Sequence, residues 1–468
     1  MRRPAFELGL FVALMFVIPA TQVVPGFGAV GTPATLLGLG LLVMLGLERL
    51  WSGHGVGAAR GVWSRNPVVI ALAVYTAVLI ASWSFGHLRP LTPLAASSAD
   101  RALLGALSLA GVALYVADRV RSWENVTRLV DFILLGGMFM CGVGMVQFFA
   151  GYDASRLLVI PGLQGGVQFQ AVGTRSIFNR PFGTTLHPIE FGVVAAALVP
   201  LALWRARSAG GVWRWCALVS AALCALLAVG RSGVLVLGVV GLVLFIGSNW
   251  RERLNLSAGA AVLVVAAGAL IPGLVGTLRS LFAGATNDPS YQARVERVPE
   301  VLRLMAEYPW FGRGFGTFTI EEYLLLDNEI QKMGIEIGVI GVAMFIAFFV
   351  TVVWAASVLK QRGGPLGSLA FALSASVIGI VVSYYTFDAF FYRILTGTLY
   401  LFVGLIAALW NGATGRWVPP AAESAPGSGR EDWEAVDIDG LPPEWLPPRG
   451  ERVEQLHPPR NSRFTMLP

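Results

Sequence analysis

Two segments of the sequence gather side chains whose chemistry suits proton transfer or anion binding. The first, residues 178–192, contains Arg180, His187 and Glu190. A histidine or a carboxylate can take a proton from a hydroxyl group, and a guanidinium can hold a negative charge beside it. A helix that begins at the proline after His187 explains the same residues without any chemistry. The spacing favours neither interpretation.

The second segment, residues 278–333, carries Arg294 and Arg297. Residues three apart lie on one side of a helix, so the two guanidiniums could grip a diphosphate through paired hydrogen bonds. The alternative is a solvated face on which they pair with Glu296 and Glu300. The spacing alone slightly favours this alternative.

Two other features of the second segment have structural explanations. An apolar stripe at helical spacing predicts a helix that lies on the membrane surface or packs over the bundle. The stripe consists of Val295, Val298, Leu302 and Met305. Gly312, Gly314 and Gly316 follow, and their spacing matches no phosphate-binding motif. A glycine-rich turn that returns the chain to the membrane is therefore favoured over a phosphate cradle.

Two single residues and one pair stand out elsewhere. Glu336 lies at the start of an apolar run, where a carboxylate is costly and usually functional or paired. Arg231 lies in a very tight turn between two apolar runs. In the last short loop, Asp388 is expected to pair with Arg393.

The composition defines the class of protein that must position these residues. The chain has 468 residues, of which 55% are hydrophobic and 13% are charged, and its mean hydropathy is +0.67. Soluble domains carry roughly 25% charged residues, so a water-soluble fold is excluded. Runs of about 17–25 apolar residues suit a bilayer. The chain shows about twelve apolar runs, some of them shorter: 6–24, 33–47, 67–83, 102–117, 129–150, 187–204, 215–230, 232–248, 255–277, 334–355, 366–386 and 394–411.

The sequence therefore predicts an all-α, polytopic transmembrane bundle over residues 1–411. Residues 412–468 are rich in proline and charge, which predicts a disordered cytoplasmic tail. With the N-terminus inside, every inside loop is basic, and both termini are expected in the cytoplasm. The long outside segments are then 151–186 and 278–333, the second large and partly helical. Both carry arginine against the insertion bias, which indicates that the charge is used there.

Other classes of ligand receive little support. A net charge of +6 would suggest nucleic acid in a soluble protein, but here the basic residues lie between apolar runs, where topology explains them. Cys141, Cys216 and Cys224 show no metal-ligand spacing, and the chain has 4 histidines. We expect no metal and no other cofactor.

Three pieces of the sequence resemble the O-antigen polymerase/ligase family of polytopic glycosyltransferases. Each is weak alone, but their order, spacing and predicted outside placement agree. The pieces are Arg180-Pro181-Phe182-Gly183 leading into His187-Pro188-Ile189-Glu190-Phe191-Gly192, then Gly230-Arg231-Ser232-Gly233, then Arg294 followed by Tyr308-Pro309-Trp310-Phe311-Gly312-Arg313-Gly314, Asp327-Asn328 and Glu336-Ile337-Gly338.

The resemblance implies a membrane enzyme at the outer face of a bacterial cytoplasmic membrane. Its donor would be a glycan on a polyprenyl diphosphate and its acceptor a hydroxyl of another glycan, with neither nucleotide sugar nor metal. A chain-length regulator and a flippase are possible partners. Ligases of the family commonly have His where this chain has Asp327, so the likeness is closest to a polymerase of O-antigen or exopolysaccharide. A ligase, a protein O-oligosaccharyltransferase and a membrane transporter are the alternatives.

The resemblance also suggests roles for the candidate residues. Negative charge builds on the leaving diphosphate, and guanidiniums would stabilise it; the candidates are Arg180, Arg231 and Arg294. The base is left open among His187, Glu190 and Asp327. Residues expected to bind substrate are Arg297, Arg313, Asn328, which would orient a sugar hydroxyl, and Glu336, which would tune an arginine. A transporter would place charges at the membrane midplane, whereas these candidates lie at the outer ends of spans.

Overall fold

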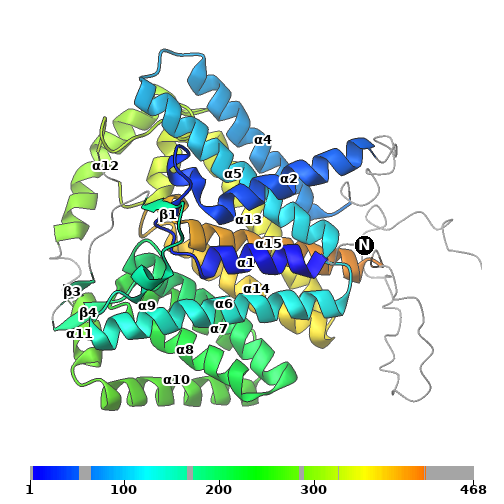
Figure 1. The fold of residues 1–468 in the computed structure, drawn as a ribbon, viewed down its shortest axis with the longest axis vertical. Coiled ribbons are helices and arrows are strands. Elements are labelled where there is room, and N and C mark those ends of the chain that lie inside the picture. Colours follow the sequence, from blue (N-terminus) through cyan, green and yellow to red (C-terminus); the bar gives the residue numbers. More distant parts are fainter. Residues whose placement is uncertain are drawn as a thin grey trace, which may run out of the picture. The chain divides into compact units, whose positions relative to one another are not determined.

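The computed structural model describes residues 4–51, 65–165, 172–175, 177–283, 289–324, 326–415 and 417. These residues are mostly helical (Figure 1). The α-helices are α1 (Pro4–Phe16), α2 (Pro33–Trp51), α4 (Pro67–His87), α5 (Pro93–Arg119), α6 (Trp123–Ala150), α7 (Pro188–Ala209), α8 (Val212–Leu227), α9 (Arg231–Ile246), α10 (Trp250–Leu270), α11 (Leu274–Ala283), α12 (Pro289–Glu307), α13 (Glu329–Gln361), α14 (Gly364–Ser383) and α15 (Arg393–Ala413).

Short elements connect the helices. Two antiparallel strand pairs lie in the loops: β1 (Gln22–Val23) with β2 (Gln164–Gly165), and β3 (Gly173–Arg175) with β4 (Phe178–Arg180). The 3-10 helices are η1 (Gly28–Gly31), η2 (Ala154–Leu158) and η4 (Ala389–Phe391). In Figure 1, β3 and β4 lie at the lower left of the bundle and β1 lies left of its centre.

The predicted polytopic helical bundle is confirmed. Within the described residues, 9 helices are long and apolar enough to cross a membrane. Three shorter apolar helices, Phe6–Phe16, Val212–Leu227 and Arg231–Ile246, coincide with the remaining predicted spans. The first predicted span was too long, because α1 ends at Phe16, shortly before Pro19, and the residue before a proline avoids the helical conformation.

Several helices begin where the sequence supplies both a cap and a proline. The side chains of Asn66, Thr92 and His187 each accept hydrogen bonds from backbone N–H groups of the helix that follows, and a proline stands next to each. A proline in the first position loses no intrahelical hydrogen bond, and the cap satisfies an otherwise unpaired donor. Local sequence therefore determines these starts.

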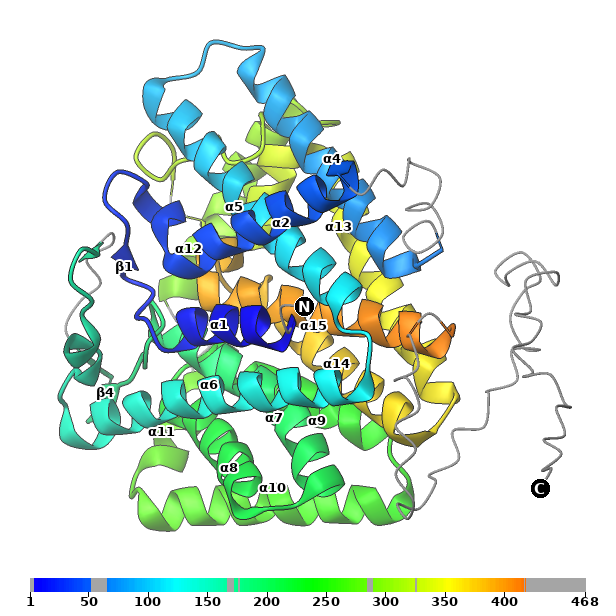
Figure 2. The same cartoon turned by 45° about the vertical axis from the view of Figure 1, so that its right-hand side comes forward.

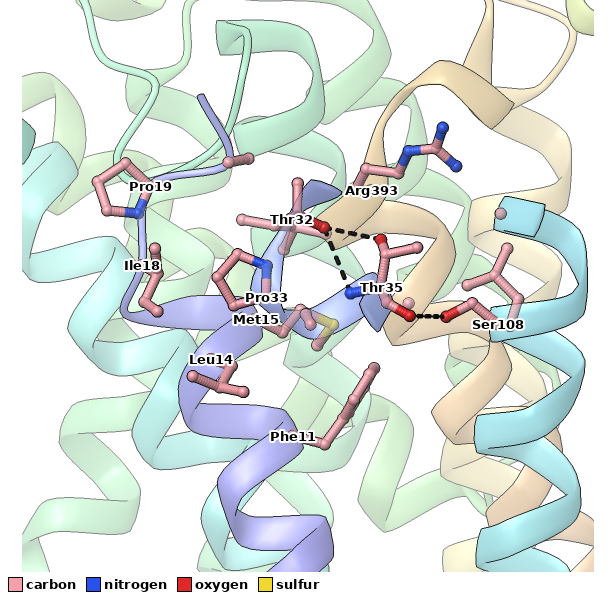
Figure 3. A pocket seen from close by; sticks show the side chains of 16 residues that line it. Phe11, Leu14, Met15, Ile18, Pro19, Thr32, Pro33, Thr35, Ser108 and Arg393 are labelled. Carbon is pink, nitrogen blue, oxygen red and sulfur yellow. Dashed lines mark hydrogen bonds between the residues drawn. The ribbon is translucent and has the colours of Figure 1, made fainter. Parts of the chain in front are cut away.

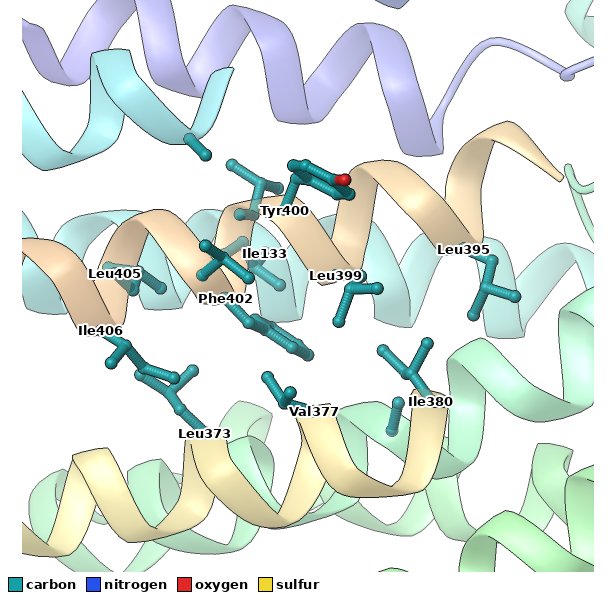
Figure 4. Close-up of a cluster of buried hydrophobic side chains, with 14 of the residues drawn as sticks. Ile133, Leu373, Val377, Ile380, Leu395, Leu399, Tyr400, Phe402, Leu405 and Ile406 are labelled. Carbon is teal, nitrogen blue, oxygen red and sulfur yellow. The ribbon is translucent and has the colours of Figure 1, made fainter. Parts of the chain in front are cut away.

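The core of the bundle forms around α15. Every residue in its 18-residue apolar window is buried, and the helix packs against α5, α7, α13 and α14. Figure 2 shows it running across the middle of the bundle. Figure 4 shows one of its faces, where Leu399, Phe402 and Ile406 meet Leu373 and Val377 of α14. Because α15 is enclosed, its first residues are held firmly at one end of the bundle.

The helix predicted in the second segment is present as α12, and it packs on the start of α13. Met305 of the apolar stripe packs with Val301 and Leu304 against Phe318 and Ile335. The other residues of the stripe, Val295, Val298 and Leu302, are 53%, 38% and 59% exposed. The prediction of a disordered tail over 412–468 falls largely outside the described residues.

Candidate active site

The turn between α14 and α15, residues 384–392, joins the elements that carry the candidate residues. The hydroxyl of Thr386 donates a hydrogen bond of 2.9 Å to Ser232 in α9. The ring of Tyr392 lies 6.2 Å from that of His187, the cap of α7. Lys332 of α13 reaches Asp388 at 3.3 Å. The starts of α7, α9 and α13 are thus gathered around one turn.

Arg231 is presented by a strained turn. Gly230 caps α9 and Arg231 is its first residue. The preceding Val229 has φ of +46° and is the non-glycine residue with a left-handed backbone in the described part of the chain. A β-branched residue in this region is a true outlier, costs about 1–3 kcal/mol, and such strain concentrates at functional sites. The fold therefore tolerates strain in order to place this turn.

Close packing of α7 against α9 accompanies that strain. A Cβ on Gly192 would lie 2.7 Å from the Cβ of Ala228 and 3.4 Å from the Cα of Gly233. The first of these distances is shorter than carbon atoms allow, so only glycine admits this approach. The start of α7, with His187, is therefore held directly beside the start of α9, with Arg231.

His187 is neutral at physiological pH. Burial and the nearby positive charge of Arg180, at the end of β4, lower the pKa of His187 to about 4. Its Nδ1 accepts a hydrogen bond of 3.1 Å from the backbone N–H of Ile189. A neutral imidazole that accepts at Nδ1 carries its proton on Nε2. In this tautomer His187 is a hydrogen-bond donor rather than a base.

Glu190 is fully engaged by backbone groups. Its Oε2 accepts a hydrogen bond from Leu186, and its Oε1 accepts from Ile394 and Leu395, at 2.9–3.1 Å. The side chain is 0% exposed. Since Tyr392 provides no side-chain cap for α15, Glu190 supplies the missing acceptor. These contacts give the residue a structural function that the sequence did not indicate.

The start of α13 separates the roles of Asp327 and Asn328. The Oδ1 of Asn328 accepts hydrogen bonds from Ile330 and Gln331, so this residue caps α13. Asp327 is half-buried and its charge acts on Tyr392, which places it beside the α14–α15 turn. Within the described residues it forms no hydrogen bond or ion pair. Of the three predicted bases, Asp327 alone has an unengaged acceptor.

The glycine-rich turn closes a break in α13. Gly338 has φ of +65°, which interrupts the helix. The backbone of residues 309–314 fills the gap: Arg313 and Gly314 donate to the carbonyls of Ile335 and Glu336. In return, Val339 and Ile340 donate to the carbonyls of Pro309 and Trp310. The backbone N–H groups of residues 312–314 are therefore used internally, which agrees with the predicted turn and argues against a phosphate cradle there.

The neighbouring polar side chains support the same turn. Glu336 is 3% exposed and its Oε1 accepts a hydrogen bond of 3.1 Å from the backbone of Phe318. Arg313 pairs with Glu307 at 3.1 Å and donates to the hydroxyl of Tyr323. Both residues, predicted to contact substrate, have structural partners here.

Arg294 and Arg297 lie on α12, as predicted. Arg297 is half-buried, and the side chain of Arg294 lies outside the described part. Glu300 forms an ion pair with Arg303 at 2.7 Å, and Arg303 also forms an ion pair with Glu307. The carboxylate of Glu300, expected as a partner for the two candidate arginines, is therefore bound by a third.

A partly buried ionic group beside the turn was not recognised from the sequence. Lys332 pairs with Asp388, which also shares a hydrogen bond with Glu329, and Glu329 accepts from the backbone of Phe390 at 3.0 Å. Burial is the largest influence and opposes the charge on Asp388, but Lys332, the hydrogen bond with Glu329 and the charge of Arg393 together lower the pKa of Asp388. The predicted pairing of Asp388 with Arg393 was wrong. No local signal reveals the true partner, since positions 332 and 388 are distant in sequence.

These features define a polytopic helical membrane protein whose candidate residues meet at the ends of its helices. Residues 216–346 match the family model for O-antigen ligase. The match runs from α8 into α13 and includes Arg231, α12, the glycine-rich turn and Asp327. It supports the predicted membership of the O-antigen polymerase/ligase family. No curated protein matches the chain.

Proposed function

We propose that this protein polymerises glycan repeat units carried on polyprenyl diphosphate at the outer face of the cytoplasmic membrane. The observation that carries the proposal is the meeting of the starts of α7, α9 and α13 at the α14–α15 turn. It brings the turn of Arg231, His187 with its neighbour Arg180, and Asp327 into one region. The family match covers the central part of this region.

The reaction exchanges one bond for another. The acceptor hydroxyl attacks the anomeric carbon of the donor sugar, and the bond from that carbon to the diphosphate oxygen breaks. Its electron pair leaves with the diphosphate, while the hydroxyl proton passes to Asp327. Arg180, Arg231 and Arg294, with Arg297 beside it, stabilise the leaving charge, and this stabilisation is stronger in a water-poor site. His187 adds a hydrogen-bond donor through Nε2.

The assay uses purified full-length protein in lipid nanodiscs with a lipid-diphosphate repeat unit, and the products are separated on a gel. Wild-type protein should form a ladder. Arg231→Gln should reduce the rate roughly 10²–10³-fold and Asp327→Asn roughly 10²–10⁴-fold. Arg156→Gln is the control, because Arg156 pairs with Asp153 in a loop at the same end. Unchanged ladders from both site variants would remove these residues from the reaction.

The same assay separates polymerase from ligase. A polymerase extends lipid-linked units into a ladder, whereas a ligase gives one transfer to a different acceptor. Ligases of the family commonly carry histidine where this chain has Asp327, and this difference supports a polymerase activity over a ligase activity. A single transfer to a lipid A–core or protein acceptor, without a ladder, would favour the ligase or the O-oligosaccharyltransferase.

A further inference from the structure

Arg393, the first residue of α15, is a charged group without a partner in the described part of the chain. Its Nε is buried and forms no hydrogen bond, and its guanidinium forms no ion pair with the described residues. A buried donor left unpaired costs about 1–3 kcal/mol, and more when it is charged. Native structures rarely keep such a group without a reason.

The nearby carboxylates do not satisfy Arg393. Glu190 and Asp388 act on it only through their charge. Both oxygens of Glu190 are taken by backbone groups of Leu186, Ile394 and Leu395, and Asp388 is bound by Lys332. Burial opposes the charge of Arg393, and the charges of these two carboxylates offset that cost only in part without using its hydrogen-bond donors.

Arg393 points toward α5 and borders a cavity. A Cβ on Gly105 would lie 2.5 Å from its Nη1, so the absence of a side chain at this position makes room for the guanidinium. The cavity is about 30 Å³, and its lining is mainly apolar, with contributions from α1, the loop after it, α2, α5 and α15; its polar lining includes Thr32, Thr35 and Ser108. Figure 3 shows the guanidinium above the two threonines, on the side where α1 ends. An apolar wall thus lies beneath a cation at the end of the bundle.

A second arginine lies one turn earlier on α5. Arg101 precedes Gly105 by four residues, so both occupy the same side of the helix. The Cδ of Arg101 lies 3.4 Å from a Cβ built on Gly28 of η1. Arg101 is half-buried and has no hydrogen bond or ion pair with the described residues. The guanidinium of Arg393 from α15 lies against Gly105, and Arg101 projects from the same side of α5. Two such guanidiniums without an ion-pair partner in the described residues are suited to an anion.

We infer that Arg393 and Arg101 form a second phosphate position, which binds the diphosphate of a lipid-linked substrate on the α5 side of α15. The inference rests on the proposed function, because joining two lipid-linked units requires two diphosphates to be bound at once. The Arg231 turn lies elsewhere, since α9 packs on α7 and α14 whereas α5 packs on α2, α4 and α15. The Arg393 position then holds the acceptor, and the Arg231 position holds the donor.

The test counts bound ligands on the full-length protein in zwitterionic nanodiscs, with farnesyl diphosphate as the probe. Wild-type protein should bind two molecules. Arg393→Gln and Arg101→Gln should each weaken one site by about tenfold or more, as expected for the loss of a charged hydrogen bond. Arg231→Gln should spare that site. Arg156→Gln, which removes an arginine that has a carboxylate partner, should leave both sites unchanged.

A second variant distinguishes loss of the phosphate position from misfolding of Arg393→Gln. Gly105→Ala keeps every charge but places a methyl group where the guanidinium lies, so it should weaken the same site as Arg393→Gln. Unchanged binding of two probes in both variants overturns the inference. Loss of the Arg393-dependent site when phosphatidylglycerol is added to the nanodiscs also overturns it, because the position then belongs to bilayer phospholipid. Competition by inorganic pyrophosphate supports recognition of the phosphate itself.

The two proposals can fail separately. If Arg393→Gln loses one probe but the wild-type protein makes no glycan ladder, the phosphate position stands and the proposed function fails. If the ladder forms and neither variant changes probe binding, the proposed function stands and the second position does not exist.

Discussion

Oε1 of Glu190, in the first turn of α7, accepts a hydrogen bond of 2.9 Å from the backbone N–H of Ile394, in the first turn of α15. The two residues are 204 positions apart. This contact fixes the end of the central helix against the helix that carries His187. It also changes the interpretation of Glu190, from a candidate base to a group that stabilises the end of the bundle.

Glu190→Ala should therefore destabilise the protein rather than remove a proton acceptor. It leaves the N–H groups of Leu186, Ile394 and Leu395 without an acceptor, at about 1–3 kcal/mol each. We expect a large drop in the melting temperature in detergent. Glu190→Gln retains one acceptor oxygen. Its melting temperature should lie between those of the wild-type protein and Glu190→Ala, and it should keep measurable glycan transfer. A stable but inactive Glu190→Gln protein would restore this residue as a base.

His187 should make stability depend on pH. Folding lowers its pKa from about 6.5 to about 4, so above pH 6.5 the group is neutral in both states and contributes no difference. As the pH falls from 6.5 to 4, the unfolded state takes up a proton that the folded state refuses, and stability is lost. Allowing for the exposed part of the ring, we expect roughly 2 kcal/mol.

His187→Asn is the matched variant for that measurement. Asparagine keeps an acceptor for the helix start and does not titrate. Unfolding in detergent at pH 7 and at pH 4.5 should show a smaller loss for the variant than for the wild-type protein. An equal loss in both proteins would contradict the assignment.

The glycine-rich turn should tolerate no side chain at Gly312. This residue has φ of +71°, and a Cβ there would lie 2.2 Å from the carbonyl oxygen of Glu336. Gly312→Ala should separate the turn from α13 and destabilise the protein by several kcal/mol, within the range of overpacking plus backbone strain. Gly363→Ala is the control: its φ is +73° and nothing lies within 4 Å of the added Cβ.

Thermal unfolding of the two glycine variants separates the cost of steric overlap from the cost of backbone strain. Gly363→Ala measures the backbone strain alone, about 1–3 kcal/mol. If Gly312→Ala costs no more than Gly363→Ala, the turn does not enter the break in α13 as described.

Removal of Lys332 should destabilise the protein, because the carboxyl groups of Asp388 and Glu329 then lack their cation. Lys332→Met leaves Asp388 and Glu329 close together without a cation. Breaking a fully buried ion pair costs about 3–5 kcal/mol, and because the side chains of Lys332 and Asp388 are 21% and 20% exposed, we expect a smaller loss of stability. Lys332→Arg keeps the charge and should be milder. The melting temperatures of both variants check this prediction, and a wild-type value for Lys332→Met would show that the pair contributes nothing.

The sequence by itself determined the membrane class, the helices and the candidate region. Apolar runs set the spans, and Asn66-Pro67 or His187-Pro188 set helix starts, because these signals act over one or two turns of chain. The predicted turn at Gly312, Gly314 and Gly316 was also local, since each glycine has a positive φ. The resemblance to the O-antigen polymerase/ligase family added the residues around Arg231 to the candidates.

Only the tertiary structure decided which polar groups were already in use. Glu190 is occupied by the backbone of α15 and Asp388 by Lys332, whereas Arg393 has no partner in the described chain. A contact between residues 56 or 204 positions apart depends on how whole helices pack. Neither periodicity nor spacing along the chain carries that information, because both report only neighbours within a few turns.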